Sequence, residues 1–143
     1  MKKNITFSLV VFFTIVFNAQ SQNVLGKWKT IDDKTGEIKS IVEVYEKSGK
    51  VYGKVVEILR ADHKKDVCSE CEGAEKNKPI LGMVIMNGLI KDGSEYNGGT
   101  ILDPENGKKY KCYITLESPD KLKLRGYIGF SLIGRTQYWI RAK

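Results

Sequence analysis

Short apolar stretches recur along the chain from residue 24 onward, and clusters of Asp, Asn, Pro, Ser and Gly separate them. The stretches are rich in Val, Ile, Tyr and Thr, which favour strands, and the clusters between them are typical of turns. The pattern therefore predicts an all-β protein with eight strands, over residues 24–31, 38–46, 51–59, 81–90, 96–102, 109–116, 122–129 and 135–142.

Six of the seven connections between these strands are short, and short connections make neighbouring strands antiparallel. The exception is the long loop 60–80, which holds the one histidine and two of the three cysteines. An open eight-stranded meander would leave two unpaired edges, whereas a closed barrel leaves none. We therefore expect a single up-and-down antiparallel barrel, lipocalin-like in its topology, whose interior holds its own side chains or one small ligand.

The strand predicted over residues 51–59 changes face along its length. Val51, Gly53 and Val55 alternate on one face, but Val56 and Ile58 take the apolar positions of the second half. One extra residue in the strand would bring both halves to the same face. We therefore predict a β-bulge at Val55-Val56.

The first residues of the chain read as a secretory signal peptide over residues 1–21. Lys2 and Lys3 precede an apolar run over residues 5–17, and small or polar residues follow it. The run is shorter than the ~20 residues of a membrane-spanning helix, and no later segment approaches that length. We expect residues 22–143 to form one domain without an integral membrane segment, in the periplasm or outside the cell.

Charge narrows the range of partners. The net charge of +7 becomes +5 when Lys2 and Lys3 leave with the signal peptide, and charges of both signs are interspersed along the rest of the chain. Nucleic acid or acidic lipid would need a clustered basic face, and no run of Lys and Arg is dense enough to indicate one. The sequence therefore predicts no nucleic-acid partner, and it leaves a protein partner undefined.

Gly26-Lys27-Trp28 in the first predicted strand and Arg141 in the last form a sparse pattern of their own. They resemble the lipocalin-type signature, a Gly-x-Trp motif whose ring packs against a late arginine at the closed end of the barrel. The resemblance implies that Trp28 and Arg141 meet. The residues by themselves are equally compatible with Trp28 as an ordinary core side chain.

Four ordered blocks carry a second resemblance: GKW at 26–28, GGTILDPENGKKY at 98–110, LKLRGYIG at 122–129 and GRTQYWIR at 134–141. Together they are similar to the secreted bacterial domain-of-unknown-function family 2147. The resemblance implies secretion and a compact β domain, and it carries no activity to transfer. The segment from Cys68 to Cys71 lies outside the four blocks.

Cys68 and Cys71 are the first candidates for chemistry. In an oxidising compartment, two cysteines this close most simply form a local disulfide that pins the long loop. The acidic residues around them disfavour a reactive thiolate and hence a redox role. Zinc is the alternative, with the ligand set His63, Cys68, Cys71 and Cys112.

Residues 103–107, Asp-Pro-Glu-Asn-Gly, read as a hairpin turn, because Pro presets the second position and Asn-Gly supplies the left-handed end. A calcium loop would need more oxygen ligands at alternating positions. The chain has no Gly-x-Ser-x-Gly elbow, no second histidine and no phosphate-binding glycine loop. We therefore assign no catalytic residue and no cofactor.

The last predicted hairpin, 122–142, decides what the barrel could bind, because its register determines which side chains face inward. With a four-residue loop between Gly129 and Gly134, Leu124 faces Trp139. The inward set is then Arg135, Gln137, Trp139 and Arg141. With a three-residue loop the same side chains lie outside, next to Arg125 and Tyr127.

An arginine inside a barrel needs a carboxylate or a bound anion, because burying it alone costs several kcal/mol. Glu43 and Glu57 are the candidate carboxylates. The leading hypothesis is a barrel that binds a small amphipathic or anionic ligand. Its site would contain Arg135, Gln137, Trp139, Tyr110, Trp28 and Arg141. The alternatives are a ligand-free envelope or interaction protein and, third, a metal-dependent enzyme.

Overall fold

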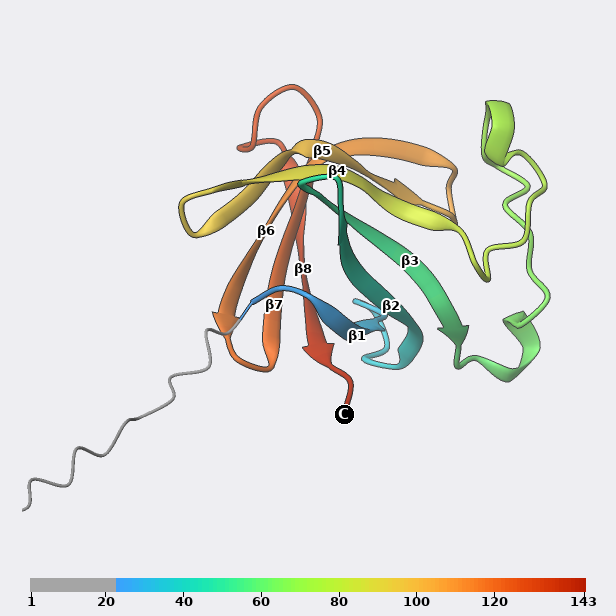
Figure 1. Ribbon diagram of the computed structural model, residues 1–143. Helices are drawn as coiled ribbons and strands as arrows, with labels where there is room; N and C mark the ends of the chain where they lie inside the picture. Colours follow the sequence, from blue (N-terminus) through green and yellow to red (C-terminus); the bar gives the residue numbers. More distant parts are fainter. Residues whose placement is uncertain (1–22) are drawn as a thin grey trace, which may run out of the picture.

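The computed structural model describes residues 23–143, so the predicted signal peptide 1–21 lies outside the described residues. Within them, eight antiparallel strands close into a barrel in sequence order, as predicted (Figure 1). The strands are β1 (Gly26–Ile31), β2 (Ile38–Lys47), β3 (Lys50–Ile58), β4 (Val84–Asp92), β5 (Glu95–Asp103), β6 (Lys108–Ser118), β7 (Lys121–Tyr127) and β8 (Gly134–Arg141).

The observed strand bounds depart most from the prediction at β4, which begins at Val84 instead of Leu81. The reason is a turn in which the Met83 N–H donates to the carbonyl of Ile80. The long connection before β4 contains two short 3-10 helices, η1 (Ala61–His63) and η2 (Gly73–Glu75). Within residues 23–143, neither of these helices is long or apolar enough to span a bilayer.

Alternation along each strand directs one set of side chains into the barrel. The register pairs Trp28 with Val42 and Leu122 with Trp139, and all four are buried. Fully buried side chains from the other strands complete this core, among them Met86, Leu89, Cys112 and Ile114. The middle of the barrel is therefore filled by its own side chains.

The predicted β-bulge in β3 is confirmed. Val42 of β2 pairs with Val55, but its neighbour Ile41 pairs with Glu57, so Val56 is the extra residue. The bulge returns Ile58 to the inward face, where it is buried.

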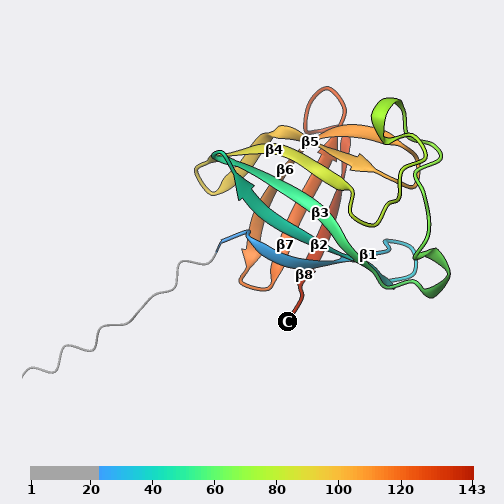
Figure 2. The same ribbon diagram turned by 45° about the vertical axis from the view of Figure 1, so that its right-hand side comes forward.

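The two ends of the barrel differ in construction (Figure 2). We call the closed end the one at which β1 begins and β8 ends, where Val24 is buried just before β1. We call the loop end the opposite one, where the β1–β2, β5–β6 and β7–β8 loops and the long connection meet. Figure 2 shows this connection, in green, beside the β5–β6 turn.

Candidate ligand site at the loop end

The final hairpin has a longer loop than either predicted alternative. β7 ends at Tyr127, and six residues separate it from β8, so Leu122 pairs with Trp139 and Leu124 with Gln137. The expected pairing of Leu124 with Trp139 is therefore wrong by two residues. A shift of two keeps the same face, because side chains alternate with a period of two. Trp139 is accordingly buried among core residues, on the inward side.

Trp28 and Arg141 meet at the closed end, as the lipocalin-type resemblance implied. The Arg141 guanidinium lies 4.2 Å from the centroid of the Trp28 ring. It also donates to the carbonyls of Asn23, Leu25 and Pro119 at 2.8–2.9 Å. The Trp28 indole N–H donates to the carbonyl of Val24. These hydrogen bonds hold the backbone at the closed end of the barrel, so we assign Trp28 and Arg141 a structural role.

Arg135 lies at the opposite end. Its register with Gly126 places it on the inward face, but it sits at the rim, where its side chain is 61% exposed. The guanidinium pairs with the carboxylate of Asp33 in the β1–β2 loop. Of the two carboxylates considered from the sequence, Glu43 and Glu57, neither is the partner. The reason is topological, because β8 and β1 are neighbours only after the barrel closes.

Between the two ends, Trp139 carries a polar group without a protein partner. The side chain is 2% exposed, and its indole N–H finds no acceptor within residues 23–143. A buried N–H of this kind is uncommon in native proteins and calls for a bound acceptor such as water or ligand. Gln137, the next inward residue toward the loop end, is half-buried.

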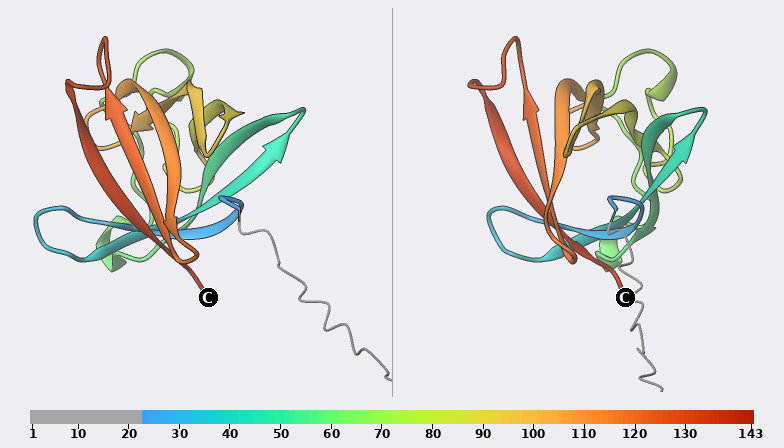
Figure 3. Two further views of the ribbon diagram at one scale, coloured as in Figure 1. Left: turned by 90° about the vertical axis from the view of Figure 1, so that its left-hand side faces the viewer. Right: turned by 60° about the vertical axis from the view of Figure 1, so that its left-hand side comes forward.

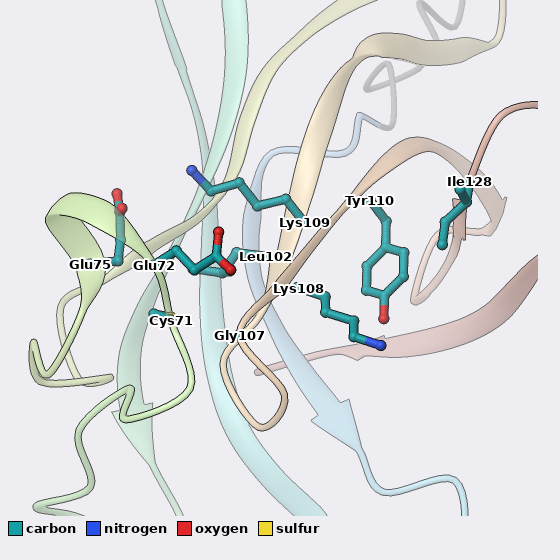
Figure 4. A pocket seen from close by; sticks show the side chains of 9 residues that line it. All are labelled: Cys71, Glu72, Glu75, Leu102, Gly107, Lys108, Lys109, Tyr110 and Ile128. Carbon is teal, nitrogen blue, oxygen red and sulfur yellow. The ribbon is translucent and has the colours of Figure 1, made fainter.

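Tyr110 belongs to a pocket of about 340 Å³ at the loop end (Figure 4). The pocket lies between the disulfide segment of the long connection and the start of β6. It is lined by Cys71, Glu72, Glu75, Leu102, Gly107, Lys108, Lys109, Tyr110 and Ile128. Of the predicted ligand-binding residues, Tyr110 alone lines it.

The pocket divides into an acidic and a basic side. In Figure 4, Glu72 and Glu75 stand on the side of the long connection, and the Lys109 side chain points toward them. Lys108 and Tyr110 point the other way, toward Ile128. Among the described residues, neither Lys108 nor Lys109 forms an ion pair within 4.0 Å. The Tyr110 hydroxyl accepts a hydrogen bond from the Asn106 amide at 3.1 Å, which leaves its own proton free to donate. Sequence reasoning missed the lysines because a pocket at the rim of a barrel leaves no periodic signal.

An ion network ties the loops of this end together. The Arg60 guanidinium lies 2.6 Å from Asp32 and 3.7 Å from Glu105, and Glu105 also lies 3.4 Å from Lys39. Backbone N–H donation from Lys34 and the Arg60 guanidinium hold the pKa of Asp32 well below its usual range. The hydrogen bond to Asp32, together with the negative charges of Glu37 and Glu105, raises the pKa of Arg60. The β5–β6 turn is thereby held against β2 and the end of β3.

The predicted disulfide between Cys68 and Cys71 is confirmed, with the two Cα atoms 5.3 Å apart. Both cysteines are buried, and the segment packs on the β5–β6 turn so closely that a Cβ at Gly107 would lie 1.9 Å from the Glu70 carbonyl oxygen. Leu102, on the outer face of β5, is buried as well. The disulfide segment is therefore an integral part of the loop end.

The zinc alternative does not match this arrangement. Cys68 and Cys71 are joined to each other, and His63 pairs with Asp66 at 2.7 Å. Cys112 lies in the barrel core, where burial raises the pKa of its thiol to about 12. Over residues 23–143, no group of three or more His, Cys, Asp or Glu side chains is arranged to hold a metal ion.

Comparison with known families supports the resemblance found in the sequence blocks. The model of a family described as an uncharacterized protein conserved in bacteria, DUF2147, matches residues 26–141. The chain belongs to the DUF2147 family. The family description names no activity, so membership gives no mechanism for this protein. No curated protein matches the chain.

A solved structure shares the fold. It is described as protein HP1028 from the human pathogen Helicobacter pylori, a member of the lipocalin family. The two chains are 23% identical, the alignment covers 85% of this chain and 84% of the other, and the TM-score is 0.74. The similarity confirms the lipocalin-like barrel and says nothing of the ligand.

Proposed function

We propose that this DUF2147 protein binds a small amphipathic anion in the pocket at the loop end of its barrel. The observation that carries the proposal is the basic side of that pocket, where Lys108 and Tyr110 stand beside the apolar side chain of Ile128. Its volume of about 340 Å³ lies within the usual range for small-molecule sites.

The chemistry of the lining supports an anionic head group with an apolar body. An ammonium without a carboxylate partner and a hydroxyl with a free proton both donate hydrogen bonds, and a carboxylate or sulfate accepts several at once. Ile128 offers exposed apolar surface beside these donors. Glu72 and Glu75 would repel an anion, which places the head group on the Lys108 side.

The buried Trp139 N–H is a donor without a protein acceptor among the described residues, but it lies one inward position from Arg141, toward the closed end, and does not line the pocket, so it is not part of the proposed site. Arg135 at the rim is neutralised by Asp33, so it contributes positive charge only if that pair opens.

Isothermal titration with decanoate, measured against decyltrimethylammonium and decyl maltoside below their micellar concentrations, tests the proposal. We expect decanoate to bind at one site and to bind more tightly than both controls. Lys108→Gln should weaken it by about tenfold, the value of one charge-assisted hydrogen bond. Lys111→Gln removes the same charge from the same strand outside the pocket and should change little.

Equal affinity for the three head groups, or an equal effect of the two lysine variants, would contradict the proposal. No binding of decanoate by the native protein would favour the ligand-free interaction protein instead.

A further inference from the structure

An apolar tip projects from the loop end of the barrel. We use this name for the β7–β8 loop, residues 128–133, which stands out beyond the neighbouring strands (Figure 1). Its four large apolar side chains are exposed: Ile128 by 65%, Phe130 by 65%, Leu132 by 87% and Ile133 by 61%. Contiguous exposed apolar surface of this kind marks an interaction site on a soluble domain.

The apolar tip is held in position by side-chain and backbone hydrogen bonds. The Arg125 guanidinium donates to the carbonyls of Ser131 at 2.6 Å and Leu132 at 3.4 Å, and to the Thr136 hydroxyl at 2.8 Å. Backbone bonds from Ile133 to Phe130 and from Ile128 to Ile133 close the loop. The carbonyls of Ser131 and Leu132 thus point toward Arg125, and the apolar side chains of the tip are exposed to solvent.

Behind the apolar tip lies a basic face that the sequence does not reveal. Because Cys112, Leu124 and Trp139 point inward, their strand neighbours point outward. The outward residues of β6, β7 and β8 include a group of basic and tyrosine side chains: Lys111, Tyr113, Lys121, Lys123, Arg125, Tyr127 and Tyr138. These three strands lie side by side (Figure 3). We call this set the basic face.

Strand pairing brings the members of the basic face into contact. Lys111 pairs with Tyr127, and Tyr113 with Arg125, although each pair is well separated in the chain. The Lys121 ammonium lies 4.5 Å from the centroid of the Tyr138 ring, and that of Lys123 lies 5.9 Å from the Tyr113 ring. Residues 121–143 contain no Asp or Glu, and the acidic residues Glu117 and Asp120 lie at the end of β6 and before β7, at the opposite end of these strands from the apolar tip.

We infer that this surface docks the protein on an anionic lipid bilayer, with the apolar tip inserted among the acyl chains. Apolar side chains that enter the interface, Tyr rings at the head-group level and Lys or Arg near anionic lipid are the components of peripheral membrane binding. The paired residues of β6 and β7 nearest the apolar tip place Lys111, Tyr127 and Arg125 at the level of the lipid head groups. A nucleic acid would use the basic face and leave the apolar tip uncovered, so the tip decides between the two partners.

The geometry also sets the orientation of docking. Ile128 belongs both to the apolar tip and to the wall of the ligand pocket, so a docked barrel presents that pocket close to the membrane surface. The acidic side of the pocket, at Glu72 and Glu75, would face away from anionic head groups. Docking does not depend on the pocket being occupied, and vesicle binding can be measured without any added ligand.

Cosedimentation with vesicles tests the inference. We expect the native protein to bind vesicles of equal parts phosphatidylglycerol and phosphatidylcholine and to bind pure phosphatidylcholine weakly. Leu132→Asp should reduce binding by more than about tenfold. Ile90→Asp, which alters an exposed apolar residue on β4, is its matched control. Lys111→Gln should weaken binding by about fivefold, and the exposed Lys50→Gln on β3 should have a smaller effect.

The tryptophan emission of Phe130→Trp should shift to shorter wavelength with anionic vesicles if the apolar tip inserts. Absence of vesicle binding, or equal effects of Leu132→Asp and Ile90→Asp, would overturn the inference. Binding of a single-stranded oligonucleotide that is lost in Lys111→Gln and kept in Leu132→Asp would reassign the basic face to nucleic acid. A dimer in analytical ultracentrifugation that Leu132→Asp dissociates would show that a second copy covers the tip.

Discussion

At the closed end of the barrel, the Trp28 indole N–H and all three nitrogens of the Arg141 guanidinium donate to protein carbonyls, and the ring and guanidinium lie against each other. At the loop end, the ammonium groups of Lys108 and Lys109 have no carboxylate within 4.0 Å in the described part of the chain, and the β7–β8 loop displays its apolar side chains to solvent. Satisfied donors and buried rings stabilise a fold, whereas unmatched donors and exposed apolar surface leave capacity for a partner. The difference locates stability at one end and recognition at the other.

Removing the Trp28 ring should break the closed end. Trp28→Ala leaves a cavity under Arg141 and should lower the free energy of unfolding by about 3–5 kcal/mol, measured by urea denaturation. Leu132→Ala at the loop end, where the side chain is 87% exposed, should change it by no more than about 0.5 kcal/mol. Similar losses in the two variants would remove the distinction between the ends.

The reactivity of the Cys112 thiol reports on the packing of the core between the two ends. The thiol is fully buried, and burial raises its pKa from 9.0 to about 12. Reaction of the native protein with Ellman's reagent near neutral pH should therefore be slower than that of the denatured protein by at least about a hundredfold. Denatured, unreduced protein should show one thiol. Three thiols would refute the disulfide at Cys68 and Cys71.

The packing of the disulfide segment on the β5–β6 turn is tested at Gly107. Gly107→Ala places a Cβ against Glu70 and Cys71 and should destabilise the protein by about 1–3 kcal/mol more than its control. Gly93→Ala is that control, because its φ of +63° resembles the +71° of Gly107 and no atom lies within 4 Å of the added Cβ. Limited proteolysis should then cut within residues 60–80 in Gly107→Ala alone. Identical behaviour would mean that the disulfide segment only rests on the barrel.

The ion network should give the smallest effect. Asp32 has a lower pKa in the folded protein than its usual 3.8, so the stability it contributes is present above pH 3.8 and is lost as the pH falls toward the folded value. Asp32→Asn lacks this dependence, and its melting temperature should approach that of the native protein as the pH falls through this range. If the melting temperatures of the two proteins change with pH in parallel, the Asp32–Arg60 pair does not stabilise the loop end.

The strands and the closure of the barrel were predictable because their signals are local. Alternation of apolar and polar residues and the turn residues between them act over a few positions, and the extra residue at Val56 follows from the same alternation. The face of Trp139 stayed open in the sequence, because a four-residue loop turns it inward and a three-residue loop outward, and the register of the structure decided it. The length of the β7–β8 loop could not be predicted from these local signals. The loop is held by hydrogen bonds from Arg125 to carbonyls six and seven residues away.

The candidate site was harder to predict than the fold. Tyr110 was among the predicted binding residues, but Lys108 and Lys109 become part of a site only because the disulfide segment forms the opposite wall of the pocket. The partner of Arg135 was missed because Asp33 lies 102 positions away in the chain. Contacts of this kind depend on which loops meet at one end of a closed barrel.

By itself, the sequence determined the all-β class, the number and order of the strands, the family and the disulfide, since periodicity, turn chemistry and close cysteine spacing are short-range properties. The tertiary structure alone decided which charges neutralise each other and which gather. It paired Arg135 with Asp33, and it placed Lys111, Lys123 and Arg125 on one face although no dense basic run exists in the chain. The physical reason is that strand pairing joins residues far apart in sequence, and charge acts through space.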